Sequence, residues 1–351
     1  MNPFEYDALP GRVVFGAGRR HEVGAEAQRL GVRRILLIAD GHDLTFVDEV
    51  VKCLGDLCVG VFTDVVQHVP LEQAKHVRDL ATASRATATV TLGGGSATGF
   101  GKAVSLTHAI PQIAIPTTYA GSELTPIWGL TDGEHKKTGR DLVVLPKVVI
   151  YDPELTLGLP VAIAGPSGMN ALAHAVEGLY GPGNNPLMTA LALESVSVLS
   201  THLPLMSASP SDLEERSHVL YGAYLAGAVL AVVGTALHHK TCHVLGGLYG
   251  LDHGKMNAVV LPHALAFNAP AIPEAYDRLS TVLGGDAAQQ LYDLARTLGT
   301  PSSLASIGMP RDGVAVAAAL IAHEAAANVR PISVEQATTL LNDCLAGERP
   351  G

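Results

Sequence analysis

The sequence is poor in cysteine, tryptophan and charge. It has four cysteines and one tryptophan among 351 residues, and only 16% of its residues are charged. Cys53, Cys58, Cys242 and Cys344 form neither a Cys-x-x-Cys pair nor the disulfide framework of a small secreted protein. We expect reduced thiols that mainly pack in the interior, and the apolar surroundings of Cys242 favour an inert thiol there as well.

Long basic runs and long apolar runs are also missing. The chain has 23 Lys and Arg against 33 Asp and Glu, a formal net charge of −10, so a nucleic-acid-binding surface is not expected. There is no uninterrupted apolar run of about eighteen residues, and residues 1–11 lack a basic, apolar signal pattern. These absences predict a soluble, cytoplasmic protein that has neither a nucleic acid nor a membrane as partner.

The first half alternates short apolar runs with amphipathic stretches. Six runs have the composition of strands: 12–15, 35–39, 59–62, 88–92, 112–115 and 148–151. The stretches 19–30 and 72–84 suit crossover helices between parallel strands. The pattern predicts a Rossmann-like α/β domain with a mostly parallel sheet, which binds its ligand at the carboxyl ends of the strands.

The second half consists of long Ala- and Leu-rich segments, among them 161–180, 187–203 and 213–233. It is predicted to be all helical. We place a dinucleotide-binding α/β domain at 1–157 and an all-α catalytic domain at 158–351. The polar segment 131–140 is expected to form a loop or hairpin on the first domain.

A glycine-rich turn follows the run 88–92. Gly93, Gly94 and Gly95 precede Ser96 and a helical pattern, so backbone N–H groups and the positive end of a helix would face a phosphate. A dinucleotide pyrophosphate fits this arrangement. The spacing matches neither the Rossmann fingerprint nor a Walker loop, and a plain strand-to-helix turn is the alternative.

Two further strand ends carry polar groups suited to a nucleotide. The segment 115–123 supplies Thr117, Thr118, Tyr119 and Ser122, whose hydroxyls can bond ribose or phosphate oxygens. Asp40 ends the run 35–39, where a carboxylate would accept both ribose hydroxyls and repel a 2′-phosphate. NADH is therefore the preferred cofactor, with NADPH as the second choice. The alternative for Asp40 is a helix N-cap.

Five of the fifteen histidines lie within residues 237–263. His239 and His243 are four apart, which places both rings on one face of a helix. His253 follows a glycine-containing turn that can bring its ring back beside them. Such a cluster either holds a divalent metal or moves protons and stabilises negative charge, unless the rings are simply bonded within the core.

A second helical pattern, from about Ser167, carries Asn170 and His174 four apart and then Glu177. A carboxylate at position 170 would complete a metal site with three imidazoles. Asparagine is a weak ligand for a transition metal. Glu177 is expected to orient a histidine or to make a packing contact.

These segments, in this order, resemble the iron-containing alcohol dehydrogenase superfamily. The shared motifs are VVFG at 13–16, GGGS at 93–96, PTT at 116–118 followed by GSE, YDP at 151–153, NALAHAVE at 170–177, and His-x-x-x-His with a later His-Gly. The resemblance implies the dehydroquinate synthase-like fold, with a cofactor-binding first domain, a helical second domain and an active site in the cleft between them. It also implies a homodimer.

At three places the sequence differs from the metal-dependent members of the superfamily, and these differences indicate one subfamily. Asn170 and Gly99 stand where those members carry aspartate, and His68-Val69-Pro70 stands in place of Asn-Pro. Together with HHKTCH at 238–243 and TTYAGSELTPIWG at 117–129, these resemble the maleylacetate reductases, which use NADH or NADPH to reduce maleylacetate to 3-oxoadipate in the breakdown of aromatic compounds. His68 and Lys137 are then expected to approach the cofactor.

The chemistry implied by this resemblance is compatible with histidine alone. Hydride addition to the conjugated double bond leaves an enolate, which imidazolium donors can stabilise and protonate. We predict His243 as the principal group, with His253, His239 and His174 around it, and no metal requirement. The set Asn170, His174, His239 and His253 would then be a vestigial metal pocket. Lys240 and Arg330 are candidates for binding the carboxylates of this dicarboxylate substrate.

Three other functions stay open from the sequence. A metal-dependent alcohol or glycerol dehydrogenase would bind iron or zinc, with Asn170 or a water completing the coordination. A cyclising lyase like dehydroquinate synthase shares the glycine loop and a metal-binding His pair, but the absence of a carboxylate at position 170 of this chain, which has Asn170, argues against that function. A non-catalytic nucleotide-binding protein would leave the histidines idle.

Overall fold

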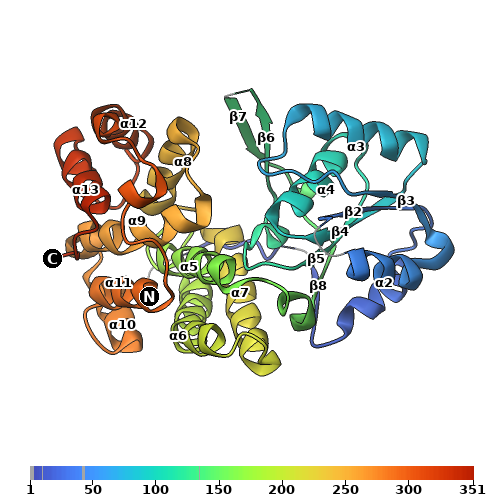
Figure 1. The fold of residues 1–351 in the computed structure, drawn as a ribbon, viewed down its shortest axis with the longest axis horizontal. Coiled ribbons are helices and arrows are strands. Elements are labelled where there is room, and N and C mark those ends of the chain that lie inside the picture. The colour runs from blue at the N-terminus through green and yellow to red at the C-terminus, as the bar shows by residue number, and fades with distance from the viewer. Residues whose placement is uncertain (1–3, 10, 42–43, 134) are drawn as a thin grey trace. The chain divides into compact units, whose positions relative to one another are not determined.

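The computed structural model describes residues 4–9, 11–41, 44–133 and 135–351 (Figure 1). The chain divides into two compact units. The first comprises Ala8–Leu159 together with Ser211–Leu220, and the second consists mainly of Pro160–Pro210 and Tyr221–Gly351. The chain therefore leaves the first unit near the predicted boundary at residue 157 and returns to it once.

The first unit contains a six-stranded sheet. Its strands are β1 (Arg12–Phe15), β2 (Ile35–Ala39), β3 (Cys58–Phe62), β4 (Ala88–Gly93), β5 (Gln112–Pro116) and β8 (Val148–Tyr151). They lie in the order β1-β8-β5-β4-β2-β3, and every pair is parallel. Parallel strands covered on both faces are apolar throughout, which is why β2, β4, β5 and β8 are buried along their whole length. The predicted sheet is confirmed.

Helices cover both faces of this sheet (Figure 1). They are α1 (Val23–Arg29), α2 (Leu44–Leu54), α3 (Leu71–Ala83) and α4 (Gly95–His108). Side chains alternate across a strand, so Ile35 and Leu37 pack into the core with α1 and α2. Leu36 and Ile38 pack on the opposite face with α3 and α4. The sequence predicted α1 and α3 in outline.

The polar segment predicted as a loop or hairpin is an antiparallel hairpin. It consists of β6 (Ile127–Asp132) and β7 (His135–Arg140). Gly139 lies opposite Trp128, and a Cβ at position 139 would come within 2.6 Å of the indole. The glycine therefore leaves room for the single tryptophan of the chain.

A buried carboxylate joins the end of β8 to the start of the chain. Asp152 is fully buried and accepts hydrogen bonds from the backbone N–H groups of Gly18 (3.1 Å) and Arg20 (3.0 Å) and from the Arg20 guanidinium (2.9 Å). The same guanidinium contacts Glu49 and Glu154. Burial by itself lowers the pKa of Arg20. The hydrogen-bonded carboxylates have the larger combined effect, so the pKa of Arg20 is raised.

Replacing Asp152 with alanine should strongly destabilise the first unit. Removing one partner of a buried ion pair leaves the other charge poorly compensated, and we expect a loss of about 3 kcal/mol in the free energy of unfolding. Urea denaturation measures this loss. Glu49→Ala is the matched control, because Glu49 is one-third exposed and its loss should have a much smaller effect. Equal losses of unfolding free energy in Asp152→Ala and Glu49→Ala would show that Asp152 is not the main buried partner of Arg20.

The second unit is helical over its described residues, as predicted. Its helices are α5 (Val161–Gly178), α6 (Pro186–Ala208), α8 (Leu237–Tyr249), α9 (His253–Asn268), α10 (Pro273–Leu283), α11 (Ala287–Thr297), α12 (Val314–Glu324) and α13 (Val334–Ala346), joined by the second part of α7 (Leu213–Val233). Glycines allow close packing: a Cβ on Gly168 would lie 2.2 Å from Leu203, and one on Gly178 would lie 2.1 Å from Val229.

Helix α7 is long and apolar enough to cross a membrane by length and composition. In its most apolar stretch, 67% of the residues are buried inside the protein. A core helix has the same properties, so this helix is weak evidence for a membrane span.

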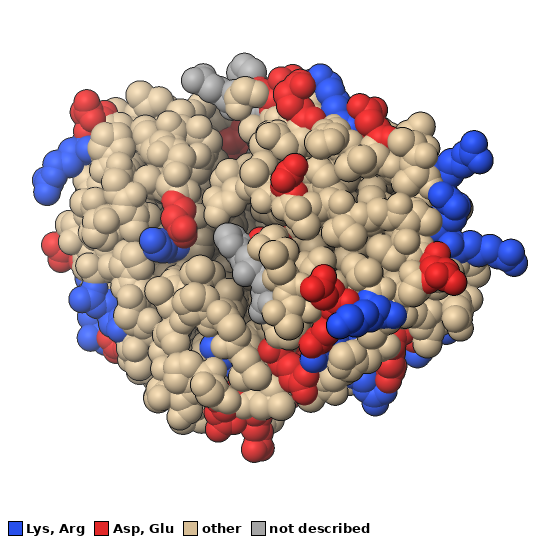
Figure 2. Space-filling model, turned by 45° about the vertical axis from the view of Figure 1, so that its right-hand side comes forward, with Lys and Arg blue, Asp and Glu red and all other residues tan. Residues whose placement is uncertain are grey.

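On the face shown in Figure 2, basic side chains are interspersed with acidic ones between broad uncharged areas.

Candidate functional site

One group of candidate residues lies in the first unit, where β4 and β5 end side by side. Gly93 pairs with Pro116 in the sheet, and the N–H of Thr117 donates to the Gly93 carbonyl (3.1 Å). Gly93 has φ 145°, a conformation that favours glycine. A Cβ on Gly94 would lie 3.1 Å from the Thr118 side chain. The two predicted phosphate-binding segments are thus in direct contact.

Helix α4 begins at this turn. Its N-cap is Gly94, which has no side chain to bond the first N–H groups, and Gly95 and Ser96 form its first residues. The unsatisfied N–H groups and the positive end of the helix favour an anionic group here. This is the arrangement that a pyrophosphate requires, and the assignment of these residues to a cofactor stays a prediction.

Asp40 adjoins the glycine turn. Its N–H donates to the Leu92 carbonyl (2.9 Å), and a Cβ on Gly93 would lie 2.9 Å from the Asp40 Cβ. The carboxylate therefore follows β2 beside the turn at the end of β4, as the sequence predicted for a ribose-binding group.

The space beside Gly99 explains one departure from the metal-dependent pattern. A Cβ at position 99 would come within 2.7 Å of Val69 Cγ2, so an aspartate side chain has no room there. His68 and Val69 both have positive φ values, 65° and 51°. A β-branched residue in this region is strained, and the carbonyls of both residues accept hydrogen bonds from Thr131.

The remaining residues predicted to bind the cofactor occupy three settings. Tyr119 is fully buried. Ser122 begins a short 3-10 helix (Ser122–Leu124), and its carbonyl accepts a hydrogen bond from the buried Lys102. Lys137 is exposed on β7, opposite Leu130. A direct role of these three residues in cofactor binding stays a prediction.

Another group of candidate residues lies in the helical unit. Helix α8 ends at Gly250, which has φ 62°, and Asp252 caps α9 by accepting from the N–H of Lys255 (2.9 Å). His253 is the first residue of α9. This helix, turn and returning ring were predicted from the sequence.

Four histidine rings follow one another in space. The rings of His174 and His239 are stacked with centroids 4.2 Å apart. Centroids are 6.3 Å apart for His239 and His243 and 6.5 Å apart for His243 and His253. His174 and His239 are buried, whereas His243 and His253 are exposed. The structure therefore brings together all four residues predicted as catalytic.

The buried pair is neutral. Burial, together with the neighbouring histidines, holds the pKa of His174 and that of His239 well below the ordinary value. His239 Nδ1 donates to Glu177 Oε2 at 2.7 Å, which leaves the lone pair of the ring on Nε2. His174 and His239 are therefore unsuited to the role of imidazolium donor that we predicted from the sequence for all four rings.

Glu177 organises the start of α8, as expected of a residue that orients a histidine. Its Oε1 accepts the backbone N–H of His238 (2.8 Å) while Oε2 holds His239. Burial raises the pKa of Glu177. No sequence pattern singles out His238, whose Nε2 donates to the Asn257 carbonyl (3.1 Å).

Among the buried polar atoms of the described residues that have no hydrogen-bond partner, three belong to this cluster. They are His239 Nε2, His174 Nδ1 and Asn170 Oδ1. Ligand atoms of Glu177, His238 and His239 also lie within 4.8 Å of one another. Because His238 Nε2 and His239 Nδ1 are committed to hydrogen bonds, we assign metal-binding capacity to His239 Nε2. His174 Nδ1 has the same capacity in the tautomer whose proton lies on Nε2, the atom that contacts the Asn170 amide at 3.3 Å. A histidine that donates one ring N–H to a carboxylate is typical of metal ligands.

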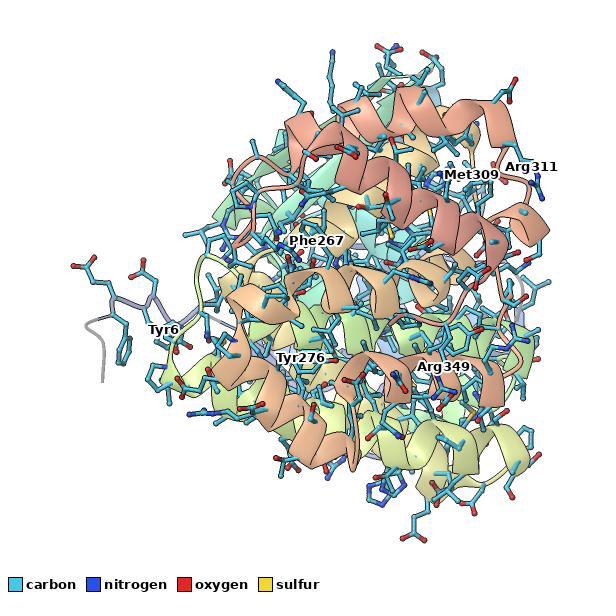
Figure 3. The ribbon with its side chains drawn as sticks, turned by 90° about the vertical axis from the view of Figure 1, so that its left-hand side faces the viewer. Tyr6, Phe267, Tyr276, Met309, Arg311 and Arg349 are labelled. Atoms are coloured by element: carbon cyan, nitrogen blue, oxygen red, sulfur yellow. The ribbon has the colours of Figure 1, made fainter. Side chains whose placement is uncertain are left out.

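The two candidates for binding substrate carboxylates differ. Lys240 is half-buried on α8, one residue beyond His239. Arg330 donates to the carbonyl of Phe267, and its guanidinium lies 4.3 Å from the centroid of that ring. Phe267 is near the end of α9 (Figure 3). Arg330 is thus held by a structural contact, and its role toward substrate stays a prediction.

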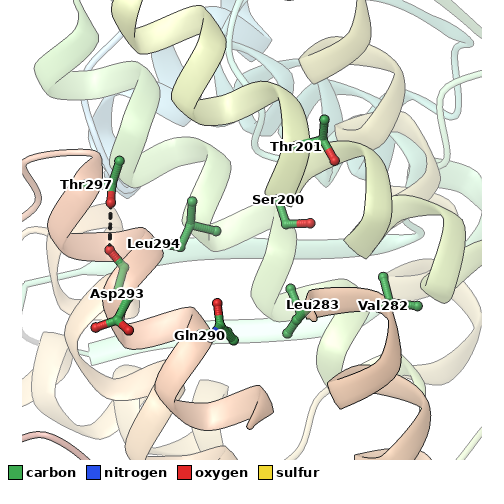
Figure 4. A pocket seen from close by; sticks show the side chains of 8 residues that line it. All are labelled: Ser200, Thr201, Val282, Leu283, Gln290, Asp293, Leu294 and Thr297. Atoms are coloured by element: carbon green, nitrogen blue, oxygen red, sulfur yellow. Dashed lines mark hydrogen bonds between the residues drawn. The ribbon is translucent and has the colours of Figure 1, made fainter. Parts of the chain in front are cut away.

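A separate pocket of about 340 Å³ lies between α6, α10 and α11 (Figure 4). Its lining is Ser200, Thr201, Val282, Leu283, Gln290, Asp293, Leu294 and Thr297. None of these described lining residues is one of the predicted site residues. We assign no role to this pocket.

Both halves of the chain match one protein family. Residues 10–153 match iron-containing alcohol dehydrogenase, and residues 165–345 match the C-terminal part of the Fe-containing alcohol dehydrogenase family. A maleylacetate reductase from Sphingobium indicum is 47% identical, over 99% of both chains. The structure of a maleylacetate reductase from Agrobacterium tumefaciens matches with TM-score 0.95 and 44% identity, over 100% of both chains.

The family matches overturn the prediction that the protein needs no metal. Both descriptions name iron. An iron-containing alcohol dehydrogenase from Corynebacterium glutamicum has TM-score 0.95 and 40% identity, covering 100% of this chain and 99% of its own. The unpartnered atoms of His174 and His239 fit such an ion, and we mistook the neutral Asn170 for evidence that the pocket is vestigial. The chain belongs to the iron-containing alcohol dehydrogenase family.

Proposed function

We propose that the protein is a maleylacetate reductase, which uses NADH to reduce the carbon-carbon double bond of maleylacetate and so forms 3-oxoadipate. The Sphingobium indicum relative supports this assignment through 47% identity over 99% of the chain. The observation in the structure that carries it is the row of four histidine rings, two of them buried and neutral and two exposed. Such a row can receive an oxygen that gains negative charge and can then supply a proton.

The chemistry of maleylacetate explains why the reaction would need this row of histidines. Maleylacetate has an alkene conjugated to a ketone, so hydride addition at carbon moves charge to the ketone oxygen as an enolate. His243 and His253 are the exposed members and are suited to donate to the enolate and to return a proton to carbon. The hydrogen bond from His239 to Glu177 fixes the His239 ring in its position beside His243.

Iron would be held by His174 and His239, with the Asn170 oxygen beside them. A bound ferrous ion would supply Lewis acidity toward a substrate oxygen. Because both rings are neutral, their nitrogen lone pairs are available without loss of a proton.

Asp40 is proposed to select NADH. Its replacement with serine should raise the ratio of kcat/KM for NADPH to that for NADH by about tenfold, because the repulsion of a 2′-phosphate is removed. Steady-state kinetics with each cofactor measure the ratio. Asp56→Ser, which changes an exposed carboxylate of the same unit, is the control. A ratio that does not change in Asp40→Ser would show that this carboxylate does not face the ribose.

Several finer features belong to the same proposal. They are use of NADPH as a weaker cofactor, a homodimer, and a cytoplasmic location without a nucleic acid or membrane partner. The substrate is a small dicarboxylate, for which Lys240 and Arg330 remain the proposed cationic contacts. Resemblance to the family supports the homodimer, and the net charge of −10 supports the absence of a nucleic acid partner.

A comparison of substrates tests the function. NADH oxidation should be fast with maleylacetate and at least about 100-fold slower, in kcat/KM, with simple aldehydes such as those that an alcohol dehydrogenase reduces. A preference for aldehydes would replace the proposal with an alcohol dehydrogenase. A reaction that leaves NADH unconsumed overall would favour a cyclising lyase.

A further inference from the structure

A buried lysine lies behind the proposed cofactor-binding segments. Lys102 is on α4, seven residues after Gly95, where this helix begins, and is only 1% exposed. Burial lowers its pKa to about 7, although the nearby Glu123 acts in the opposite direction. The sequence signal for a buried lysine is its place in a helical segment of otherwise small, apolar or neutral side chains.

The ammonium group of Lys102 is surrounded by acceptors from one segment. It donates to the carbonyls of Ser122 and Ile127, both at 2.7 Å, and to the Thr125 hydroxyl at 3.0 Å. The Ser122 hydroxyl is a fourth acceptor at 3.3 Å, so all three donors of the group have an acceptor. A methionine would fill the same volume without the penalty of burying an amine, so the directed hydrogen bonds are what the lysine adds.

The bonded segment is the continuation of the threonine-rich turn. That turn is fixed at its start, where the Thr117 N–H donates to Gly93 and the Thr118 side chain lies against Gly94. Its other end, from Ser122 to Ile127, is fixed by Lys102. Because Lys102 belongs to the helix that starts at Gly95, it connects the glycine turn and the threonine turn through rigid secondary structure.

Neighbouring groups stabilise the same end of the segment. Glu123 is buried and accepts a hydrogen bond from the Tyr151 hydroxyl (2.7 Å) at the end of β8. The Thr125 hydroxyl donates to the Ser122 carbonyl (3.1 Å). A loss of the ammonium would remove the Lys102 donor from the Ile127 carbonyl and one of several donors from the Ser122 carbonyl, and so loosen the segment.

We propose that Lys102 is a positioning residue for the dinucleotide: by bonding Ser122, Thr125 and Ile127 it holds the threonine turn against the glycine turn in the conformation that binds the pyrophosphate. This inference rests on the proposed NADH-dependent function. It concerns NADH binding and does not require that maleylacetate is the substrate.

The test measures NADH binding to purified protein by fluorescence titration, with no second substrate present. Lys102→Met should raise the Kd for NADH by about tenfold or more. With substrate present, the KM for NADH should rise in parallel, while kcat at saturating NADH stays within about threefold of wild type. Lys75→Met, at an exposed lysine of α3 in the same unit, should leave both constants unchanged.

A second variant covers the case in which Lys102→Met does not fold. Thr125→Val keeps the shape of the side chain and removes one acceptor, so it should raise the Kd for NADH in the same direction by about threefold. A folded Lys102→Met with wild-type NADH affinity would overturn the proposal, and so would a Thr125→Val with wild-type affinity. If NADH binds as expected but maleylacetate is not reduced, the proposed function fails and the role of Lys102 stands.

Discussion

Replacing His243 with alanine should lower kcat for maleylacetate reduction by at least about 100-fold. His243 is an exposed ring of the row and lies between His239 and His253. Its removal takes away the group proposed to donate to the enolate while the buried histidines remain in place. The KM for NADH should change little, because the cofactor turns belong to the other unit. Steady-state kinetics at saturating NADH measure the effect.

His323→Ala is the matched control for this substitution. The His323 side chain is 84% exposed on α12, so its loss should leave kcat within about twofold of wild type. A His243→Ala enzyme with nearly normal kcat would remove His243 from the mechanism. His253 would then be the remaining exposed ring of the row.

Replacing Glu177 with glutamine should weaken binding of ferrous ion by about 10- to 100-fold. The glutamine keeps the size of the side chain but presents either an amide N–H or a neutral carbonyl to His239 Nδ1. The charged contact that places the lone pair on Nε2 is lost, and so is the fixed orientation of the ring. Metal analysis after equilibration with buffered ferrous ion measures the effect, and kcat should fall with metal content.

The control for Glu177→Gln is Glu194→Gln, at an exposed carboxylate of the same unit, which should bind ferrous ion like wild type. Equal metal content in Glu177→Gln and wild type would show that Glu177 does not act on the ion through His239. A wild-type protein that takes up no ferrous ion would contradict the assignment of His174 and His239 as ligands.

The elements of the first unit could be predicted because local sequence and burial agree there. β2 reads Ile-Leu-Leu-Ile-Ala and is buried on both faces, so its composition alone distinguishes it from an exposed strand. The glycines of 93–95 marked the turn because a positive φ and close approach to Thr118 require them. The histidine cluster was also predictable, since helical spacing and Gly250 determine where the rings lie.

Other features depend on contacts between distant residues and could not be predicted in this way. The neutrality of His174 and His239 follows from burial beside other histidines, which composition does not reveal. The exclusion of an aspartate at Gly99 follows from the position of Val69. The metal prediction was wrong for a related reason. The prediction depended on the weak metal affinity of Asn170 alone. The hydrogen bond by which Glu177 orients His239 toward a metal is visible only in the structure.

Transfer of deuterium from reduced cofactor to substrate tests the central claim most directly. With NADH deuterated at the transferable position and maleylacetate as substrate, the product should be 3-oxoadipate with deuterium on a carbon of the former double bond and the ketone intact. NMR spectroscopy and mass spectrometry of the product locate the label. Deuterium on a carbinol carbon, formed by reduction of the ketone, would contradict the proposed reaction and assign the protein to alcohol and carbonyl chemistry.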